Sequence, residues 1–262
     1  PFISIFLIFI VSGTIAALYN FIPAFLKVKT GAHEVITTMM FAHIARYLSP
    51  LFIRSMGATT DAAQSYKTEL IHDSSFLPVF KSFLPDANYR LHIGILIAIV
   101  VALIVHYILY KTRFGFEVRA VGQNKDAAKV QGISSGKVIV LALLFSGFLA
   151  GLSGTNQVLG SDHQMFENLD AGFGWNGISV ALLASNSPIG VIFTSLLWGA
   201  LDAGGQYMSR TTSVPSAVVE IIKGIVLFLV VANYIYAYLG NRIKRKRKQL
   251  AAQKELAEKS EV

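Results

Sequence analysis

Long apolar runs alternate with short polar segments along the chain. Several of the runs approach the roughly 20 residues that a helix needs to cross about 30 Å of hydrocarbon. They cover residues 1–20, 34–53, 91–110, 137–160 and 215–239. We therefore predict about five helices that each span a membrane once.

A further apolar region, residues 172–205, is interrupted at Asn186-Ser187-Pro188. Pro188 cannot continue a helix begun before it, and its ring disfavours helical geometry at Ser187. We predict two short helices here, about 172–186 and 189–205, that enter the membrane and return to the same side. The predicted fold is all-α: a polytopic helical membrane protein with about five full spans plus this broken helix pair.

Composition agrees with the hydrophobic pattern. The chain is 53% hydrophobic and only 15% charged, which places it outside the range of soluble globular proteins. It opens on Pro1 inside an apolar run, without the charged segment of a signal peptide, so we expect an N-terminally truncated fragment. It contains no cysteine, which excludes disulfides and thiolate chemistry.

The distribution of charge predicts the orientation in the membrane. Basic residues near span ends stay on the cytoplasmic side. They are concentrated in residues 111–136 and in the tail, whereas in 54–90 acidic and basic residues balance. We therefore predict 21–33, 111–136 and the tail inside, with 54–90 and 161–171 outside. Residues 1–240 would form the membrane domain and 241–262 a basic cytoplasmic tail.

Three sequence patterns that could suggest nucleotide or metal binding lack the surrounding residues that such sites require. Residues 172–177 match G-x-G-x-x-G but lie at a membrane boundary, without the strand that a dinucleotide site requires. Residues 132–138 have neither the spacing of a phosphate loop nor its Ser or Thr. The six histidines lack ligand spacing. We expect no metal and no cofactor bound by this chain, and no nucleic-acid partner.

Within the basic loop, residues 125–131 are predicted to form a short helix. Asn124 can cap its first turn, and Gly132 can take the left-handed conformation that ends it. A short, stiff helix between two spans would let a cytoplasmic partner push on membrane helices. An ordinary solvated loop with one helical turn explains the same residues.

Several longer motifs accompany this loop. They are Ile22-Pro23-Ala24-Phe25-Leu26-Lys27, His33-Glu34-Val35-Ile36-Thr37-Thr38-Met39-Met40, Gly115-Phe116-Glu117-Val118-Arg119-Ala120-Val121-Gly122-Gln123-Asn124, Ala127-Ala128, Gly132-Ile133, Phe145-Ser146-Gly147-Phe148-Leu149-Ala150-Gly151-Leu152-Ser153-Gly154, Gly172-Phe173-Gly174-Trp175-Asn176-Gly177-Ile178-Ser179-Val180-Ala181-Leu182-Leu183, Asn186-Ser187-Pro188-Ile189-Gly190 and Val214-Pro215. Together they resemble the permease family of ribose, nucleoside and branched-chain amino-acid ABC importers, nearest its nucleoside branch.

This resemblance implies a transporter subunit rather than an enzyme, in a bacterial plasma membrane. The family pairs two permease chains, docks a cytoplasmic ATPase on a coupling helix and receives its solute from an extracellular binding lipoprotein. ATP hydrolysis would occur in the separate ATPase subunit. The positions matching the coupling segment are Arg119, Gly122, Asn124, Ala127, Ala128 and Gly132.

Candidate pathway residues follow from the broken helix pair, because broken helices expose backbone groups where they line a cavity. Asn186 and Ser187 lie at the break, and Trp175 and Asn176 at the outer entrance. Trp175 could stack on a base or anchor the helix at the interface. Glu220 is three residues from Lys223, so it could line the pathway or form a satisfied pair.

The predicted function is nucleoside translocation, with purine nucleosides favoured. The alternatives are an ABC permease for a simple sugar such as ribose, or an ATP-independent secondary transporter. A secondary transporter would need a second broken helix and coupling-ion ligands at mid-membrane. A structural or signalling subunit would explain the spans but not the loop 111–136.

Overall fold

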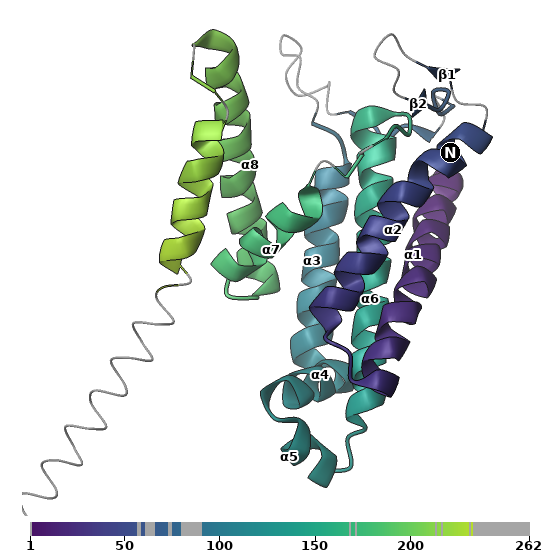
Figure 1. Cartoon of the computed structure of the whole chain (residues 1–262), viewed down its shortest axis with the longest axis vertical. Helices are drawn as coiled ribbons and strands as arrows, with labels where there is room; N and C mark the ends of the chain where they lie inside the picture. The colour runs from purple at the N-terminus through teal and green to yellow at the C-terminus, as the bar shows by residue number, and fades with distance from the viewer. Residues whose placement is uncertain are drawn as a thin grey trace, which may run out of the picture. The chain divides into compact units, whose positions relative to one another are not determined.

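The computed structural model describes residues 2–56, 59–60, 66–72, 75–79, 91–167, 169–170, 172–212, 214–215, 217–230 and 232. The chain divides into two compact units, Pro1–Ala171 and Gly172–Val262. Nearly all described residues of both units are helical (Figure 1), so the predicted all-α class is confirmed. The predicted tail, 241–262, lies outside the described residues.

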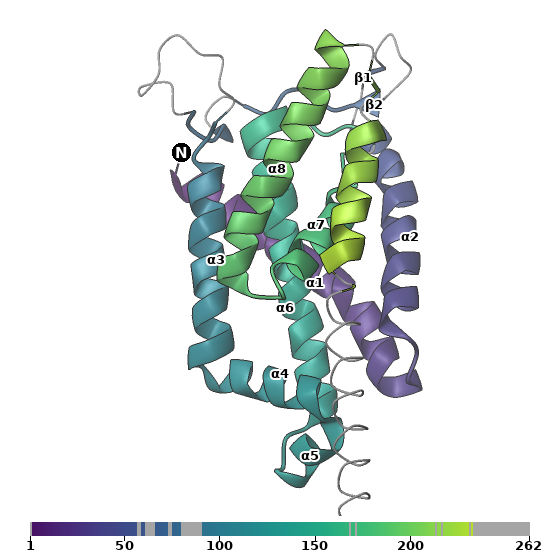
Figure 2. The ribbon, with the colours of Figure 1, turned by 90° about the vertical axis from the view of Figure 1, so that its left-hand side faces the viewer.

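The first unit contains most of the long helices and a small two-stranded hairpin. Its elements, in chain order, are α1 (Phe2–Thr30), α2 (Glu34–Ser55), β1 (Thr59–Thr60), β2 (Tyr66–Lys67), α3 (Gly94–Lys111), α4 (Arg113–Gln123), α5 (Lys125–Val130), α6 (Ser135–Gln157) and the π-helical turn η2 (Val158–Asp162). The strands β1 and β2 pair antiparallel. Figure 2 shows α4 lying across the lower ends of α3 and α6.

Among the described residues, four helical segments are long and apolar enough to cross a membrane: Ile3–Thr30, Gly94–Lys111, Ser135–Asp162 and Pro188–Thr211. Three of them lie in the first unit. The predicted span 34–53 is the helix α2, which carries more polar residues and is not in this set. The protein is therefore a multi-pass helical membrane protein.

The first helix is longer than its sequence predicted. We expected a span to residue 20 followed by an inside loop 21–33, but α1 continues to Thr30. Pro23 lies inside the helix and is fully buried, and helices in membranes tolerate proline where neighbouring groups compensate for the lost hydrogen bond. Lys27 and Lys29 therefore occupy the last turn of α1 rather than a loop.

Small residues bring α1 and α6 into close contact. A Cβ atom added at Gly151 would lie 2.7 Å from the carbonyl oxygen of Ser12 and 2.8 Å from the Cα of Gly13. The Ser12 hydroxyl donates to the carbonyl of Gly151 at 3.1 Å, and Asn20 Nδ2 donates to Leu143 O at 2.6 Å. Glycines spaced four apart permit this backbone approach between membrane helices.

An ordered cap closes the opposite end of α6 from α4. Residues 68–72 and 75–77 contact residues 159–165 through hydrogen bonds from Thr68 N to Met165 O, Ile71 N to His163 O and Leu77 N to Leu159 O at 2.9–3.0 Å. Phe9, Leu77 and Leu159 pack together beneath it. Thr68, Ile71 and Leu77 of the predicted outer loop 54–90 are thus bound through their main-chain amides to η2 and the residues that follow it.

The second unit contains the predicted broken pair. It comprises α7 (Phe173–Leu183), α8 (Pro188–Thr211) and a further helix at residues 217–230. Ser185 and Asn186 adopt positive φ angles of 52° and 58°, and Pro188 begins α8, so the chain breaks at the predicted position.

The two helices of the pair are unequal, which corrects the predicted bounds. The first has 11 residues, whereas α8 has 24 and continues past the predicted end at 205. Its length alone is sufficient to cross a membrane. Only α7 has the length of a half-span.

Candidate functional site

The basic loop 111–136 contains two helices rather than the single short helix predicted from sequence. Thr112 ends α3 and caps α4, because its hydroxyl accepts a hydrogen bond from Gly115 N at 3.2 Å. Val118 and Val121, three residues apart, then face the protein interior. The Thr112 cap and this apolar spacing were the sequence signals for α4, which the prediction missed.

The predicted caps of the second helix are confirmed. Asn124 adopts an extended conformation, and its Oδ1 accepts from Asp126 N at 3.0 Å and Ala127 N at 3.1 Å. At the other end Gly132 has a φ of 81°, which glycine adopts without steric cost. The helix α5 ends at Val130, one residue before the predicted Gln131.

A small hydrophobic core joins α4, α5 and the start of α6. Val121, Ala128 and Val138 are buried together, with exposed fractions of 5%, 2% and 4%. Because one residue comes from each helix, the three helices form a single packed element. We call the pair α4 and α5, held on this core, the α4–α5 hairpin.

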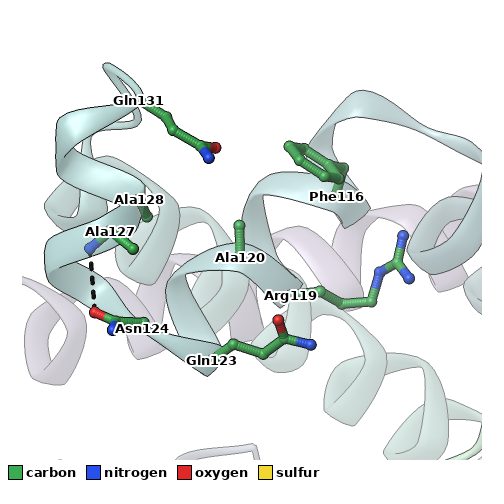
Figure 3. A pocket seen from close by; sticks show the side chains of 8 residues that line it. All are labelled: Phe116, Arg119, Ala120, Gln123, Asn124, Ala127, Ala128 and Gln131. Atoms are coloured by element: carbon green, nitrogen blue, oxygen red, sulfur yellow. Dashed lines mark hydrogen bonds between the residues drawn. The ribbon is translucent and has the colours of Figure 1, made fainter.

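The α4–α5 hairpin encloses a pocket of about 360 Å³ on its surface (Figure 3). Gln131 extends from α5 toward α4, and the alanine side chains lie between the two helices. Of the residues predicted from sequence, Gly122 and Gly132 do not line it. The lining residues are Phe116, Arg119, Ala120, Gln123, Asn124, Ala127, Ala128 and Gln131.

The structure thus places four of the six predicted coupling residues around one pocket. The sequence did not single out Phe116, Ala120, Gln123 or Gln131, because their common location depends on the angle between α4 and α5. That angle is set by the packing of Val121 on Ala128.

Among the described residues, Arg119 is the only charged one that lines the pocket. Its Nε donates to Gly115 O at 3.4 Å, and its guanidinium lies 5.1 Å from the ring centre of Tyr110. Among the described residues no carboxylate forms an ion pair with it, whereas Arg113 pairs with Glu117 at 4.0 Å on the same helix. Within the part of the chain that the structure describes, the positive charge of the pocket therefore has no ion-pair partner.

The corner between α1 and α2 carries an ion pair of its own. Lys27 Nζ lies 2.8 Å from Glu34 Oε2, where the two helices meet. Val28 lies close to Gly136 in the first turn of α6, since a Cβ there would stand 3.0 Å from Val28 Cγ1. The last turn of α1, the first turn of α2 and the first turn of α6 thus lie close together, next to the α4–α5 hairpin.

The predicted pathway residues lie in the second unit and do not form one cluster. Trp175 is 61% exposed on α7, which also carries Asn176. Ser187 Oγ accepts from Gly190 N at 3.4 Å and so caps α8. Asn186 occupies the turn before it with a positive φ.

Glu220 belongs to an ion cluster that the sequence only partly predicted. Lys223 is 2% exposed and donates to Glu220 Oε1 at 2.9 Å and to Asp202 on α8. Its Nζ also lies 5.4 Å from the ring centre of Trp198. Asp202 was missed, although it is the single acidic residue of the apolar stretch 188–205 and so was a detectable signal.

Within the part of the chain that the structure describes, no group of three or more His, Cys, Asp or Glu side chains could hold a metal ion.

Comparison with known proteins identifies the family. The sequence profile described as "Branched-chain amino acid transport system / permease component" matches residues 1–231. The guanosine ABC transporter permease protein NupP of Bacillus subtilis is 36% identical over 239 residues, which are 90% of this chain and 67% of that protein.

Two further relatives are similar over nearly the same region. The nucleoside ABC transporter permease protein NupB of Lactococcus lactis subsp. cremoris is 34% identical over 87% of this chain and 64% of its own length. The glucose ABC transporter permease protein TsgB13 of Haloferax volcanii is 30% identical over 88% of this chain and 62% of its own. The chain thus spans somewhat under two thirds of these two proteins, and no solved structure matches it significantly.

The predicted resemblance is confirmed, and the chain belongs to the permease family of branched-chain amino acid and related ABC transport systems.

Proposed function

We propose that this chain forms part of the translocation pathway of an ABC importer for nucleosides, with purine nucleosides as the preferred solutes, and is driven by a cytoplasmic ATPase. The observation that carries the proposal is the α4–α5 hairpin. It is a short capped element, packed on its own core and inserted between the spanning helices α3 and α6. The two most similar relatives named above, permeases for guanosine and for nucleosides, support the choice of solute.

The proposed mechanism is rigid-body transmission. The ATPase would contact α5 and α4 around Arg119, Asn124 and Ala127. Because the core of Val121, Ala128 and Val138 couples both helices to α6, a displacement of α5 would tilt α6 rather than bend a loop. Thr112 is the single residue between α3 and α4 and caps both helices, so α3 would move with α4. ATP binding then biases one of two arrangements of the spans.

The proposed assembly contains further subunits. A second permease chain would complete the pathway, and an extracellular lipoprotein would deliver the solute. The chain itself is not an enzyme, and ATP hydrolysis belongs to the ATPase subunit. The hairpin and the basic tail face the cytoplasm of a bacterial cell, because Lys125, Lys129 and Lys137 are costly to translocate.

For the pathway we propose the region of the broken helix. Trp175 and Asn176 on α7, with Asn186 and Ser187 at the break, would contribute polar and aromatic contacts. The hydroxyl of Ser187 already caps α8, so its role would be to fix where α8 begins and thereby maintain the break. Glu220 would act together with Asp202 and Lys223 as one ionic group.

A crosslinking experiment tests the coupling proposal. These 262 residues contain no cysteine, so Gln123→Cys places a single thiol at the pocket rim, and any cysteine elsewhere in the full-length permease is first replaced by serine. We expect a disulfide with a single-cysteine ATPase whose yield changes with ATP. The control is Thr68→Cys in the cap, at the opposite end of α6, which should not crosslink. A Gln123→Cys thiol that is accessible from inside but never near the ATPase would favour an ATP-independent transporter.

A sugar permease is the second candidate, because the relative from Haloferax volcanii is a glucose ABC transporter permease. Uptake of labelled guanosine in the presence of excess unlabelled guanosine, ribose or glucose separates the two. We expect competition by guanosine only. Strong competition by either sugar would contradict the nucleoside assignment.

A further inference from the structure

The pocket of the α4–α5 hairpin has apolar walls and a polar rim. Ala120, Ala127 and Ala128 give it small apolar walls, and Phe116 adds an aromatic side that is 54% exposed. The polar groups are Arg119 and the amides of Gln123, Asn124 and Gln131. Such a site accepts the stem of a side chain on its apolar part and a polar end group at its rim.

The free polar groups at the rim favour an anion. The Oδ1 of Asn124 is already occupied by the amides of Asp126 and Ala127, so the side chain has only its Nδ2 donors left. Arg119 can only donate. Gln123 and Gln131 can rotate to offer donors. No acidic side chain lines the pocket, and the guanidinium has no carboxylate partner among the described residues.

The surface around the pocket is also positively charged. Lys125 and Lys129 project from α5, and Asp126 is the one acidic residue of that helix. On α4, Glu117 lies 4.0 Å from Arg113, and among the described residues it forms no ion pair with Arg119. A partner that docks here must therefore present negative charge, and the apolar walls require that the charge arrive on a carbon stem.

We propose that the pocket receives an acidic side chain, Asp or Glu, of the ATPase subunit, and that Arg119 binds its carboxylate. This inference rests on the proposed function, which supplies the ATPase. A guanidinium can bind a carboxylate through two parallel hydrogen bonds, a geometry that fixes orientation as well as position. The pair would anchor the ATPase to α4 while its surroundings contact α5, so that both helices move together.

The first test compares two arginines of the same helix. Arg119→Ala removes the cation of the pocket, and Arg113→Ala removes one whose side chain is 95% exposed outside it. The full-length permease complex in nanodiscs is titrated with purified ATPase. We expect Arg119→Ala to weaken ATPase binding at least about tenfold and Arg113→Ala less than about twofold. Arg119→Lys should be intermediate, because an ammonium cannot bind a carboxylate bidentately.

A second pair of variants tests the cavity rather than the charge. Ala127→Leu fills the pocket from α5, whereas Val130→Leu adds bulk on the same helix at a side chain that is 89% exposed and outside the pocket. We expect only Ala127→Leu to weaken ATPase binding. Circular dichroism melting of each variant confirms that the fold is retained.

The outcomes separate the possible failures. If wild-type permease does not bind the ATPase at all, the proposed function fails. If the ATPase binds but Arg119→Ala and Arg113→Ala weaken its binding equally, then non-specific electrostatic attraction holds it to the permease. That result would overturn the pocket proposal. The proposal is also overturned if the Arg119→Ala effect appears only in nanodiscs with anionic lipid, because a lipid headgroup would then be the occupant. Recovery of binding by Arg119→Glu with an ATPase Glu→Arg variant supports the pair directly.

Discussion

Asn124 ends one helix and begins the next. Its extended backbone separates α4 from α5, and its Oδ1 accepts the amides of Asp126 and Ala127, two groups that would otherwise lack partners. A helix as short as α5, with 6 residues, has little intrinsic stability, so a single cap determines whether it forms.

Replacing this cap should loosen the hairpin. We expect Asn124→Ala to destabilise α5 by about 1 kcal/mol, because both amides lose their acceptor. Asn124→Asp keeps an acceptor oxygen and should behave nearly as wild type in helix stability. Hydrogen exchange of residues 125–131 measures the effect. Equal protection in Asn124→Ala and the wild type would mean that packing of Ala128 alone maintains the helix.

Lys223 provides a second case at the residue scale. Its ammonium is buried and contacts Asp202, Glu220 and the ring of Trp198. One cation thereby connects α8 to the helix at residues 217–230. Intramembrane charges are tolerated where they pair with one another, as here.

Removal of this cation should destabilise the second unit. Lys223→Met leaves two carboxylates without their partner, and we expect a loss of about 1–3 kcal/mol in the free energy of unfolding. The double variant Lys223→Met with Asp202→Asn should recover part of that loss, since one uncompensated charge is removed. Thermal melting in detergent measures both. A double variant less stable than Lys223→Met would argue against direct pairing.

At the scale of elements, α1 and α6 are held by close backbone contact. Three glycines of α6 follow each other at helical spacing, but only two of them meet α1. A Cβ at Gly147 or Gly151 would approach α1 atoms within 2.9 Å, whereas one at Gly154 would meet nothing within 4 Å.

This difference gives a matched pair of variants. Gly151→Ala should destabilise the permease by about 1–3 kcal/mol, because the backbones of α1 and α6 must separate to admit the methyl group. Gly154→Ala should be neutral or slightly stabilising, since alanine is the better helix former. Melting temperatures of the two purified variants decide the matter. Equal shifts would show that glycine content rather than the α1–α6 contact sets the stability.

A histidine that contacts the cap over α6 should make the cap sensitive to acid. His92 lies just before α3, accepts from Gly94 N at 3.1 Å and is 3.3 Å from Ser161 Oγ. Burial lowers the pKa of His92 below its ordinary value of 6.5, and the nearby His163 lowers it further. The cap therefore favours the neutral imidazole.

The sign of the pH effect follows from this lowered pKa. Well above pH 6.5, His92 is neutral in both the folded and the unfolded state, and its full contribution to stability is present. As the pH falls through 6.5 the unfolded state binds a proton first, so stability is lost until the folded state is protonated too. We expect the melting temperature to fall on acidification more in the wild type than in His92→Gln. A parallel fall in both would assign the acid sensitivity to other groups.

At the scale of the whole molecule, the two units have different characters. The first contains two close-packed spans, a cytoplasmic hairpin in the proposed orientation and an ordered cap at its opposite end. The second consists of a half-length helix, a long helix and an ionic connection to a third. In the proposed mechanism, the first unit would transmit the movement of the ATPase, and the second unit would contribute the residues that contact the solute.

The proposed orientation is testable on intact cells. Since the chain has no cysteine, Thr68→Cys and Lys129→Cys each introduce one thiol, in the cap and on α5 respectively. We expect a membrane-impermeant maleimide to label Thr68→Cys in intact cells and Lys129→Cys only after permeabilisation. The reverse pattern would invert the topology and remove the basis for a cytoplasmic ATPase contact.

The sequence by itself determined the features that depend on local chemistry. Apolar run length indicated three of the four helical segments long enough to span a membrane among the described residues. Pro188 located the break, and Asn124 with Gly132 bounded the short helix, because each acts on the backbone next to it. The motifs between residues 22 and 215, taken together, indicated the family, which comparison then confirmed.

Only the tertiary structure decided which residues act together. Whether Pro23 ends a helix depends on the packing around it, and Asp202 becomes the partner of Lys223 only once α8 and residues 217–230 pack together. The helix α4 and the pocket it forms with α5 likewise depend on burial of Val121 against Ala128 and Val138. Contacts between residues far apart in the chain carry no local signature, so their geometry follows from packing alone.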